Sequence, residues 1–278
     1  MIHVDPLPMP SLPTRRVALV IQYLGTHFYG WQRQANHQSV QQTIEDTLTQ
    51  ICRHTVVLHG AGRTDTGVHA LAQVAHFDTH SPVPPDRWSK ILNSYLPRDI
   101  LIRQSVGVPS NWHARFSAVW RRYRYTIFTA AIPNLFVRDY SWHYYLHTLD
   151  QELMHSALEP MLGEQNLSAL QRAGSKRPHA WLTVQEAKCW RERDFVFMEM
   201  QASGFLYGMI RLLVGLLVEV GRSRLSVAEF TNIWQQQRRN DVKYAAPPQG
   251  LCLLGVGYDN SPFFKQEVAN REVLTMIT

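Results

Sequence analysis

Along residues 16–108, segments whose apolar residues have the spacing of a strand alternate with segments whose apolar residues have the spacing of a helix. This alternation limits the possible folds more than any other feature of the sequence. Two segments carry apolar residues at helical spacing: one follows Ser39, a candidate N-cap, and the other starts at Pro84. The strands are expected at residues 16–24, 56–59, 68–77 and 100–108. The resulting order, strand–helix–strand–strand–helix–strand, is the split βαβ pattern of ferredoxin-like α+β folds.

The second half of the chain repeats this alternation more loosely. Asp150 and Ser226 are candidate N-caps of two helices, and residues 209–220 are expected to form a third, strongly apolar helix. Strands are expected at residues 121–130, 184–190, 195–202 and 251–258. The sequence therefore predicts an α+β protein made of two similar ferredoxin-like halves, with a cleft between them as the natural binding site.

The chain is predicted to divide into four segments. Residues 1–14 are rich in proline, lack the basic and apolar regions of a signal peptide, and are expected to form a flexible leader. An N-terminal α+β subdomain is expected at 15–115, a C-terminal α+β subdomain at 116–265 and a tail at 266–278.

Composition favours a globular protein with a polyanionic partner. The 278 residues are 45% hydrophobic and 18% charged, with a net charge of +6 and a pI of about 9.3. A mildly basic enzyme without a nucleic acid partner is equally compatible with these values. The three cysteines are scattered and contain no Cys-x-x-Cys, which indicates thiols in a reducing cytosol. We therefore expect a cytoplasmic protein.

The apolar stretch 204–221 is expected to be a buried helix and not a membrane span. Arg211 lies near its middle and Glu219 near its end, and each would cost about 2.5–3.5 kcal/mol at the centre of a membrane helix. A buried guanidinium needs a carboxylate partner. Glu219 is too far along the same helix for direct contact, so a carboxylate from elsewhere, such as Asp65, is the better candidate.

Residues 60–77 combine a glycine-rich turn with a strand and carry two charged groups, Arg63 and Asp65. Glycines allow tight or positive-φ backbone, so this turn suits a reaction centre, although it also suits a plain hairpin. A dinucleotide-binding loop is excluded because a strand, not a helix, follows the glycines. Asp65, Thr66 and Gly67 match the aspartic protease signature, but that chemistry needs two carboxylates and the chain has one such tripeptide.

Cations and aromatic rings alternate around residues 115–125. Strand alternation places Arg121, Tyr123 and Tyr125 on one face, and Arg122 and Arg124 on the other. Such a face can pair with phosphates and stack on an unpaired base. The alternative is a half-buried strand whose arginines extend to solvent. The thirteen histidines show no metal-binding spacing, so no metal site is predicted.

Together these residues closely resemble the TruA family of tRNA pseudouridine synthases, from about residue 15 to residue 260. The central block is Gly-Arg-Thr-Asp-x-Gly-Val-His-Ala at 62–70. Supporting blocks follow the family's order at residues 25–34, 39–41, 73–77, 93–100, 113–118, 122–125, 209–215 and 250–251. This ordered set is far more specific than a single Asp-Thr-Gly.

The resemblance implies two α+β halves joined in one catalytic unit, with a central mixed or antiparallel sheet across both and a basic cleft that holds the aspartate. Family members act as homodimers, bind tRNA, and use neither a metal nor an organic cofactor. They convert uridines on the 3′ side of the anticodon stem-loop to pseudouridine. We expect this chain to do the same, away from any membrane.

The resemblance also assigns roles to five residues. Asp65 is the expected catalytic carboxylate, acting either as a nucleophile or as a base while a glycal forms. Arg211 is expected to pair with Asp65 and keep it ionised. Tyr123 is expected to stack on the target uracil and is a candidate for assisting proton removal at C5. Arg63 is expected to help flip the base, and Leu251 to form an apolar wall.

Some positions depart from the family pattern. Thr66 replaces the usual alanine, and Leu167 and Leu170 stand where phenylalanines are usual. Residues 180–182 lack the usual arginine–threonine pair. These departures concern peripheral tRNA contacts. The alternative function is a non-catalytic RNA-binding protein on the same scaffold, although a pure binder needs no carboxylate beside a phosphate path.

Overall fold

The structure is a computed structural model that describes residues 13–172, 174 and 179–263. Its helices are α1 (Val40–Cys52), α2 (Trp88–Asn93), α3 (Gln151–Leu158), α4 (Met209–Gly221) and α5 (Val227–Gln235). Its strands are β1 (Arg15–Tyr23), β2 (His59–Gly60), β3 (His69–Thr79), β4 (Ile100–Val108), β5 (Ala118–Phe128), β6 (Trp142–His143), β7 (Gly163–Asn166), β8 (Trp181–Glu192), β9 (Phe195–Ala202) and β10 (Leu251–Tyr258).

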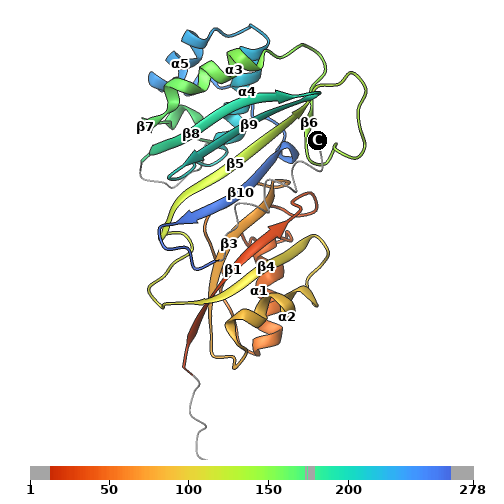
Figure 1. The fold of residues 1–278 in the computed structure, drawn as a ribbon, viewed down its shortest axis with the longest axis vertical. Helices are drawn as coiled ribbons and strands as arrows, with labels where there is room; N and C mark the ends of the chain where they lie inside the picture. The colour runs from red at the N-terminus through yellow and green to blue at the C-terminus, as the bar shows by residue number, and fades with distance from the viewer. Residues whose placement is uncertain (1–12, 173, 175–178, 264–278) are drawn as a thin grey trace, which may run out of the picture.

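One mixed sheet runs through both halves of the protein (Figure 1) in the order β4-β1-β3-β10-β5-β9-β8-β7. The halves meet where β10 pairs with β3 in parallel, through His69 with Cys252 and Ala70 with Leu253. The long neighbours on either side of this junction are antiparallel. The predicted α+β class with a mixed sheet is confirmed. The last strand of the chain therefore lies in the middle of the sheet and joins the two halves.

Both groups of helices lie on the same side of the sheet, α1 and α2 over the first half and α3, α4 and α5 over the second (Figure 1). The predicted N-caps are confirmed. The Ser39 side chain accepts from the N–H of Gln42, Asp150 accepts from the first N–H groups of α3, and Ser226 forms a capping box with Glu229. These bonds satisfy donors that a helix start would otherwise leave unpaired.

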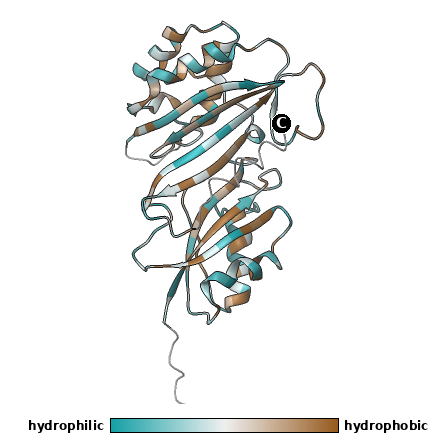
Figure 2. Cartoon of the chain, viewed as in Figure 1, coloured by the Kyte–Doolittle hydropathy of each residue, from teal (hydrophilic) through white to brown (hydrophobic). Residues whose placement is uncertain are grey.

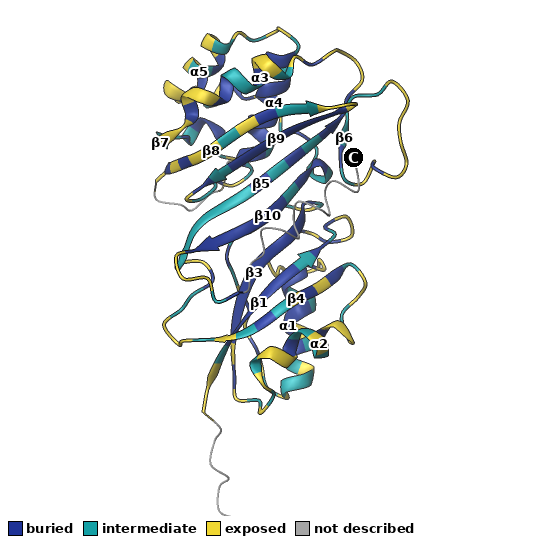
Figure 3. Ribbon diagram, in the orientation of Figure 1, coloured by how far each residue is buried: buried dark blue, intermediate teal, exposed yellow. Residues whose placement is uncertain are grey.

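The core follows the centre of the sheet and the inner helix faces (Figure 3). Strands β1, β3 and β10 are largely hydrophobic, whereas polar and apolar residues alternate along β5 (Figure 2). Helix α4 is buried along almost its whole length, which confirms the prediction of a core helix. Among the residues that the structure describes, no helix is long and apolar enough to cross a membrane.

The prediction of a strand at residues 56–59 is wrong, since only His59 of that range belongs to β2. Its backbone is held by α1 instead: the N–H of Leu58 donates to Glu45 Oε1, and Gln41 Nε2 donates to Leu58 O. The side chains of one helix thus replace a neighbouring strand as hydrogen-bond partners. Strand β7 was not predicted, because its sequence Gly-Glu-Gln-Asn has no apolar alternation.

Two further sets of predictions concern the chain ends and the positions that depart from the family pattern. The leader predicted at 1–14 lies mostly outside the described residues, and the tail at 266–278 lies wholly outside them. Leu167 and Leu170, which depart from the family pattern, are buried in the core, whereas Trp181 is half exposed. The two leucines therefore fill space inside the second half and do not face solvent.

Candidate active site

The turn that carries Asp65 lies between β2 and β3 and is fixed by the loop after β1. The N–H of Trp31 donates to Thr64 O at 3.1 Å, and the N–H of Gly67 donates to Phe28 O at 3.4 Å. Gly30 and Gly67 have φ angles of 77° and 79°, which disfavour other residues. A Cβ atom on Gly30 would also lie 2.6 Å from Thr64 O. Glycine at these two positions allows two loops to approach closely around the carboxylate.

Side-chain hydrogen bonds hold the same turn from the sheet. The Tyr23 hydroxyl and Thr64 Oγ1 are 2.7 Å apart, and Gln73 Nε2 donates to Gly62 O at 2.9 Å. His69 Nδ1 accepts from the N–H of Gly25, so Nε2 carries the proton and donates to Asp139 O at 2.9 Å. Burial lowers the pKa of His69, which agrees with this neutral tautomer. The turn is therefore rigid before any substrate arrives.

Asp65 and Arg211 form an ion pair across the two halves. Arg211 Nη1 lies 3.0 Å from Asp65 Oδ2, and each side chain is 15% exposed. Arg211 Nε also donates to Ala246 O at 2.7 Å, which fixes the guanidinium from a second side. The structure thus brings together the two residues that the sequence analysis paired, one from the turn before β3 and one from α4.

Tyr123 lies near this pair on β5, and Leu251 begins the neighbouring strand β10. The Tyr123 and Phe205 rings meet edge to face, with centroids 4.8 Å apart, and the Tyr123 hydroxyl makes no hydrogen bond to the described residues. Burial raises the pKa of Tyr123; the Arg121 charge opposes this effect and the Asp65 charge adds to it. Leu251 is buried and pairs in register with Tyr125. A buried phenol therefore lies near the carboxylate, and a buried leucine lies on the adjacent strand.

Tyr125 has a structural role, unlike Tyr123, although both lie on one face of β5. Its hydroxyl donates to Pro247 O at 2.7 Å, just before β10 begins. The segment that receives this bond also contains Ala246, whose carbonyl holds Arg211. Tyr125 thereby stabilises the backbone that positions the guanidinium.

Arg63 and Arg121 occupy different positions at the mouth of the site. Arg63 is exposed and has no ion-pair partner among the described residues. Arg121 donates through Nη2 to Ala61 O at 3.1 Å and to Arg115 O at 2.7 Å. Sequence reasoning placed Arg121 on the correct face of β5 but did not predict this bridge. Backbone acceptors leave no residue signature in a sequence, so no signal could have identified them.

Arg122 and Arg124 lie on the opposite face, as strand alternation predicted. Arg122 pairs with Glu186, and Arg124 with Glu199. These two arginines are therefore neutralised within the protein. Both side chains remain partly exposed, which agrees with the alternative of a half-buried strand for this face.

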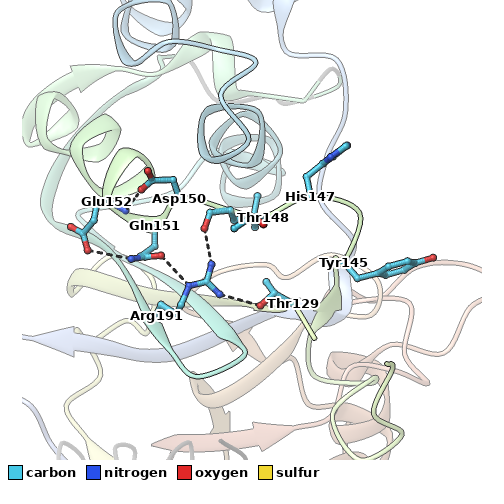
Figure 4. A pocket seen from close by; sticks show the side chains of 9 residues that line it. Thr129, Tyr145, His147, Thr148, Asp150, Gln151, Glu152 and Arg191 are labelled. Carbon is cyan, nitrogen blue, oxygen red and sulfur yellow. Dashed lines mark hydrogen bonds between the residues drawn. The ribbon is translucent and has the colours of Figure 1, made fainter. Parts of the chain in front are cut away.

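Two further features lie outside this site. An open hollow at the start of α3 (Figure 4) is lined by residues of the second half, where Arg191 donates to Gln151, Thr129 and Leu149. It contains none of the predicted site residues. Within the described part of the chain, no group of three or more His, Cys, Asp or Glu side chains could hold a metal ion.

Comparison with known proteins identifies similar sequences over most of the chain. A family model described as tRNA pseudouridine synthase matches residues 19–117 and 157–259. The tRNA pseudouridine synthase A of Rippkaea orientalis is 61% identical over 249 residues, which cover 90% of this chain and 85% of the relative. The protein of the same name from Nostoc sp. is 59% identical over 250 residues, covering 90% and 89%. That of Prochlorococcus marinus is 50% identical over 256 residues, covering 92% and 87%.

Proposed function

The chain belongs to the tRNA pseudouridine synthase family, and on that premise we propose that Asp65 is the carboxylate with which it isomerises uridine. The protein is an isomerase that converts uridine in tRNA to pseudouridine. The observation that carries the assignment of Asp65 is its ion pair with Arg211, formed between the two halves on a rigid turn. The uridines on the 3′ side of the anticodon stem-loop are the proposed targets.

The reaction explains why these residue types are needed. The N1–C1′ bond breaks, the uracil turns, C5 bonds to C1′, and the proton on C5 is lost while N1 gains one. A stacked base is out of reach, so the nucleotide must first leave the helix, at a cost of a few kcal/mol. Asp65 then acts either as a nucleophile or as a base at the sugar, and both routes need one carboxylate at C1′ or next to it.

The surrounding residues have complementary roles in this proposal. Arg211 balances the negative charge of Asp65 and fixes the orientation of the carboxylate. The second hydrogen bond of Arg211, to Ala246 O, holds the guanidinium in place. Arg63, exposed and two residues from Asp65, enters the space that the flipped base leaves. Leu251 forms the apolar wall against which the uracil turns. No cofactor enters any of these steps.

Incubation of the wild-type protein with an unmodified tRNA transcript tests the activity. We expect pseudouridine to appear on the 3′ side of the anticodon stem-loop when every uridine of the transcript is mapped. A transcript without uridines at these positions is the control and should stay unmodified. Tight tRNA binding without any conversion would instead support the non-catalytic RNA-binding alternative.

Tyr123→Phe separates stacking from hydroxyl chemistry. The ring stays, so tRNA affinity should change less than about threefold, while the single-turnover rate should fall about 10- to 100-fold because the hydroxyl is lost. Melting temperature should not change, since the hydroxyl makes no hydrogen bond to the described residues. An unchanged rate would mean that the ring alone acts, by stacking.

We also propose that the protein is a homodimer, which the family resemblance implies. Five large apolar side chains in and after the loop that follows β5 are more than half exposed, namely Ile132, Leu135, Phe136, Tyr145 and Leu146. Large apolar side chains that are exposed this close together along the chain are typical of an interaction surface.

Light scattering tests the dimer. The wild type should have twice the 32.1 kDa mass of the chain, and a Leu135→Asp/Phe136→Asp variant should shift toward the monomer. Leu101→Asp, at another exposed apolar position, is the matched control and should stay dimeric. A monomeric wild type at micromolar concentration would contradict this proposal.

The proposed location is the cytoplasm. A tRNA substrate is available there, and the three cysteines, Cys52, Cys189 and Cys252, are free, as expected in a reducing compartment. Fractionation of cells that express the tagged protein should place it with cytoplasmic markers.

A further inference from the structure

Phe116 is an aromatic residue that the fold holds in solvent. It is 76% exposed, although it lies in the short segment between β4 and β5 that connects the two halves. A single exposed aromatic residue is unremarkable by itself. Three further observations make Phe116 different: the rigidity of its turn, the cation beside it and the hydrogen-bonded bridge from its turn to the Asp65 turn.

A network of hydrogen bonds fixes the turn that presents Phe116. Two hydrogen bonds join His113 and Ser117. The N–H of His113 donates to Ser117 Oγ at 3.0 Å, and the N–H of Ser117 donates to His113 O at 2.9 Å. His113 Nδ1 accepts from the N–H groups of Arg115 and Phe116 at 3.0 and 3.4 Å. Burial, with the nearby cation of Arg16 and the ring of His59, lowers the pKa of His113, so the imidazole stays neutral and can accept both.

The turn is also attached to the sheet. Ala114, at its centre, is fully buried; its N–H donates to His76 Nδ1 at 3.2 Å, and its carbonyl accepts from the Tyr258 hydroxyl at 2.7 Å. Phe116 therefore keeps its exposed position without a substrate. A preorganised aromatic group loses little conformational entropy when it binds.

One cation and a second ring lie against Phe116. The Arg115 guanidinium lies over the Phe116 ring, 5.6 Å from its centroid, and the His113 ring packs at 4.4 Å. Arg115 is exposed and, like Arg63, has no ion-pair partner among the described residues. A ring beside a cation that has no ion-pair partner is suited to a nucleotide, which offers a flat base and a phosphate.

Arg121 connects this turn directly to the turn that carries Asp65. Its Nη2 atom donates both to Arg115 O at 2.7 Å and to Ala61 O at 3.1 Å. Phe116 follows the first of these carbonyls, and Arg63 lies two residues after the second. The backbone of the Phe116 turn therefore lies next to the backbone of the turn that carries Arg63 and Asp65.

We propose that Phe116, flanked by Arg115, stacks on an unpaired nucleotide of the substrate RNA next to the one that enters the Asp65 site. This inference rests on the proposed function. Stacking would hold the neighbouring nucleotide outside the helix while the target turns, and Arg115 would contact the adjoining phosphate. A nucleotide is favoured over a protein partner, because the turn offers one exposed ring with one cation, Arg115, beside it.

Phe116→Ala tests the proposal against two matched variants. Tyr95→Ala removes another exposed aromatic ring, 60% exposed beyond α2, and Phe116→Trp keeps a stacking surface. We expect Phe116→Ala to weaken binding of an unmodified tRNA transcript at least about fivefold, while Tyr95→Ala and Phe116→Trp stay within about twofold of the wild type. Melting temperatures should agree among all four proteins, since an exposed ring contributes little to packing.

A second measurement identifies the stacked nucleotide. A set of tRNAs, each with one abasic nucleotide in the anticodon loop, is bound to the wild type and to Phe116→Ala. At one position the abasic change should weaken tRNA binding by the wild type but should not weaken binding by Phe116→Ala any further, because the abasic nucleotide and the Phe116→Ala substitution remove the same contact. Equal losses in both proteins at every position, or unchanged binding by Phe116→Ala, would overturn the proposal. A wild type that forms no pseudouridine would instead refute the proposed function.

Discussion

Asp65→Asn is expected to reduce pseudouridine formation by at least about 10³-fold while the protein continues to bind tRNA within about threefold of the wild type. The amide has the size of the carboxylate and can still accept a hydrogen bond from Arg211, which now lies 3.0 Å from Asp65 Oδ2. It cannot serve as a nucleophile or a base. Single-turnover conversion of a labelled transcript and equilibrium binding of the same transcript measure the two quantities separately.

The control for this substitution is Asp78→Asn. Asp78 also pairs with an arginine, Arg16, but lies on β3 outside the site, and its side chain is 45% exposed. This variant should keep the wild-type rate. Substantial turnover by Asp65→Asn would remove the carboxylate from the mechanism, whereas equal loss in both variants would indicate a general effect of charge on tRNA binding.

The parts of the fold that the sequence predicted are those determined by local chemistry. Ser39, Asp150 and Ser226 begin helices because each side chain accepts a hydrogen bond that its own helix start requires. Strands β4 and β10 match their predicted ranges, since hydrophobic runs with clear turn residues define them. Residues 56–58 have a similar pattern but bond to side chains of α1, a tertiary contact that no local pattern contains.

The same distinction applies to the site. The pairing of Asp65 with Arg211 could be predicted because a buried guanidinium requires a carboxylate and the apolar helix offers none within reach. The roles of Tyr123 and Arg63 came from the family resemblance alone. The bridge from Arg121 to two backbone carbonyls could not be predicted, because it depends on how the turn before β3 meets the segment before β5.

Arg211→Met should be the most disruptive single change outside the carboxylate itself. It leaves Asp65, whose side chain is only 15% exposed, without its counter-ion, and it removes the bond to Ala246 O. Breaking a buried pair from one side costs about 3–5 kcal/mol, and the partial exposure here reduces the expected loss of unfolding free energy to about 2–3 kcal/mol. The rate of pseudouridine formation should fall at least about 10²-fold, because the carboxylate loses its orientation.

Combining this change with Asp65→Asn distinguishes the charge from the packing. If the unpaired carboxylate causes the instability, the double variant should be more stable than Arg211→Met by about 1–2 kcal/mol, since a neutral amide needs no counter-ion. Urea unfolding of the four proteins gives the coupling free energy. Additive losses would mean that Arg211 stabilises the protein through Ala246 and not through Asp65. In that case the guanidinium would position the segment before β10, and another group would have to balance the charge of Asp65.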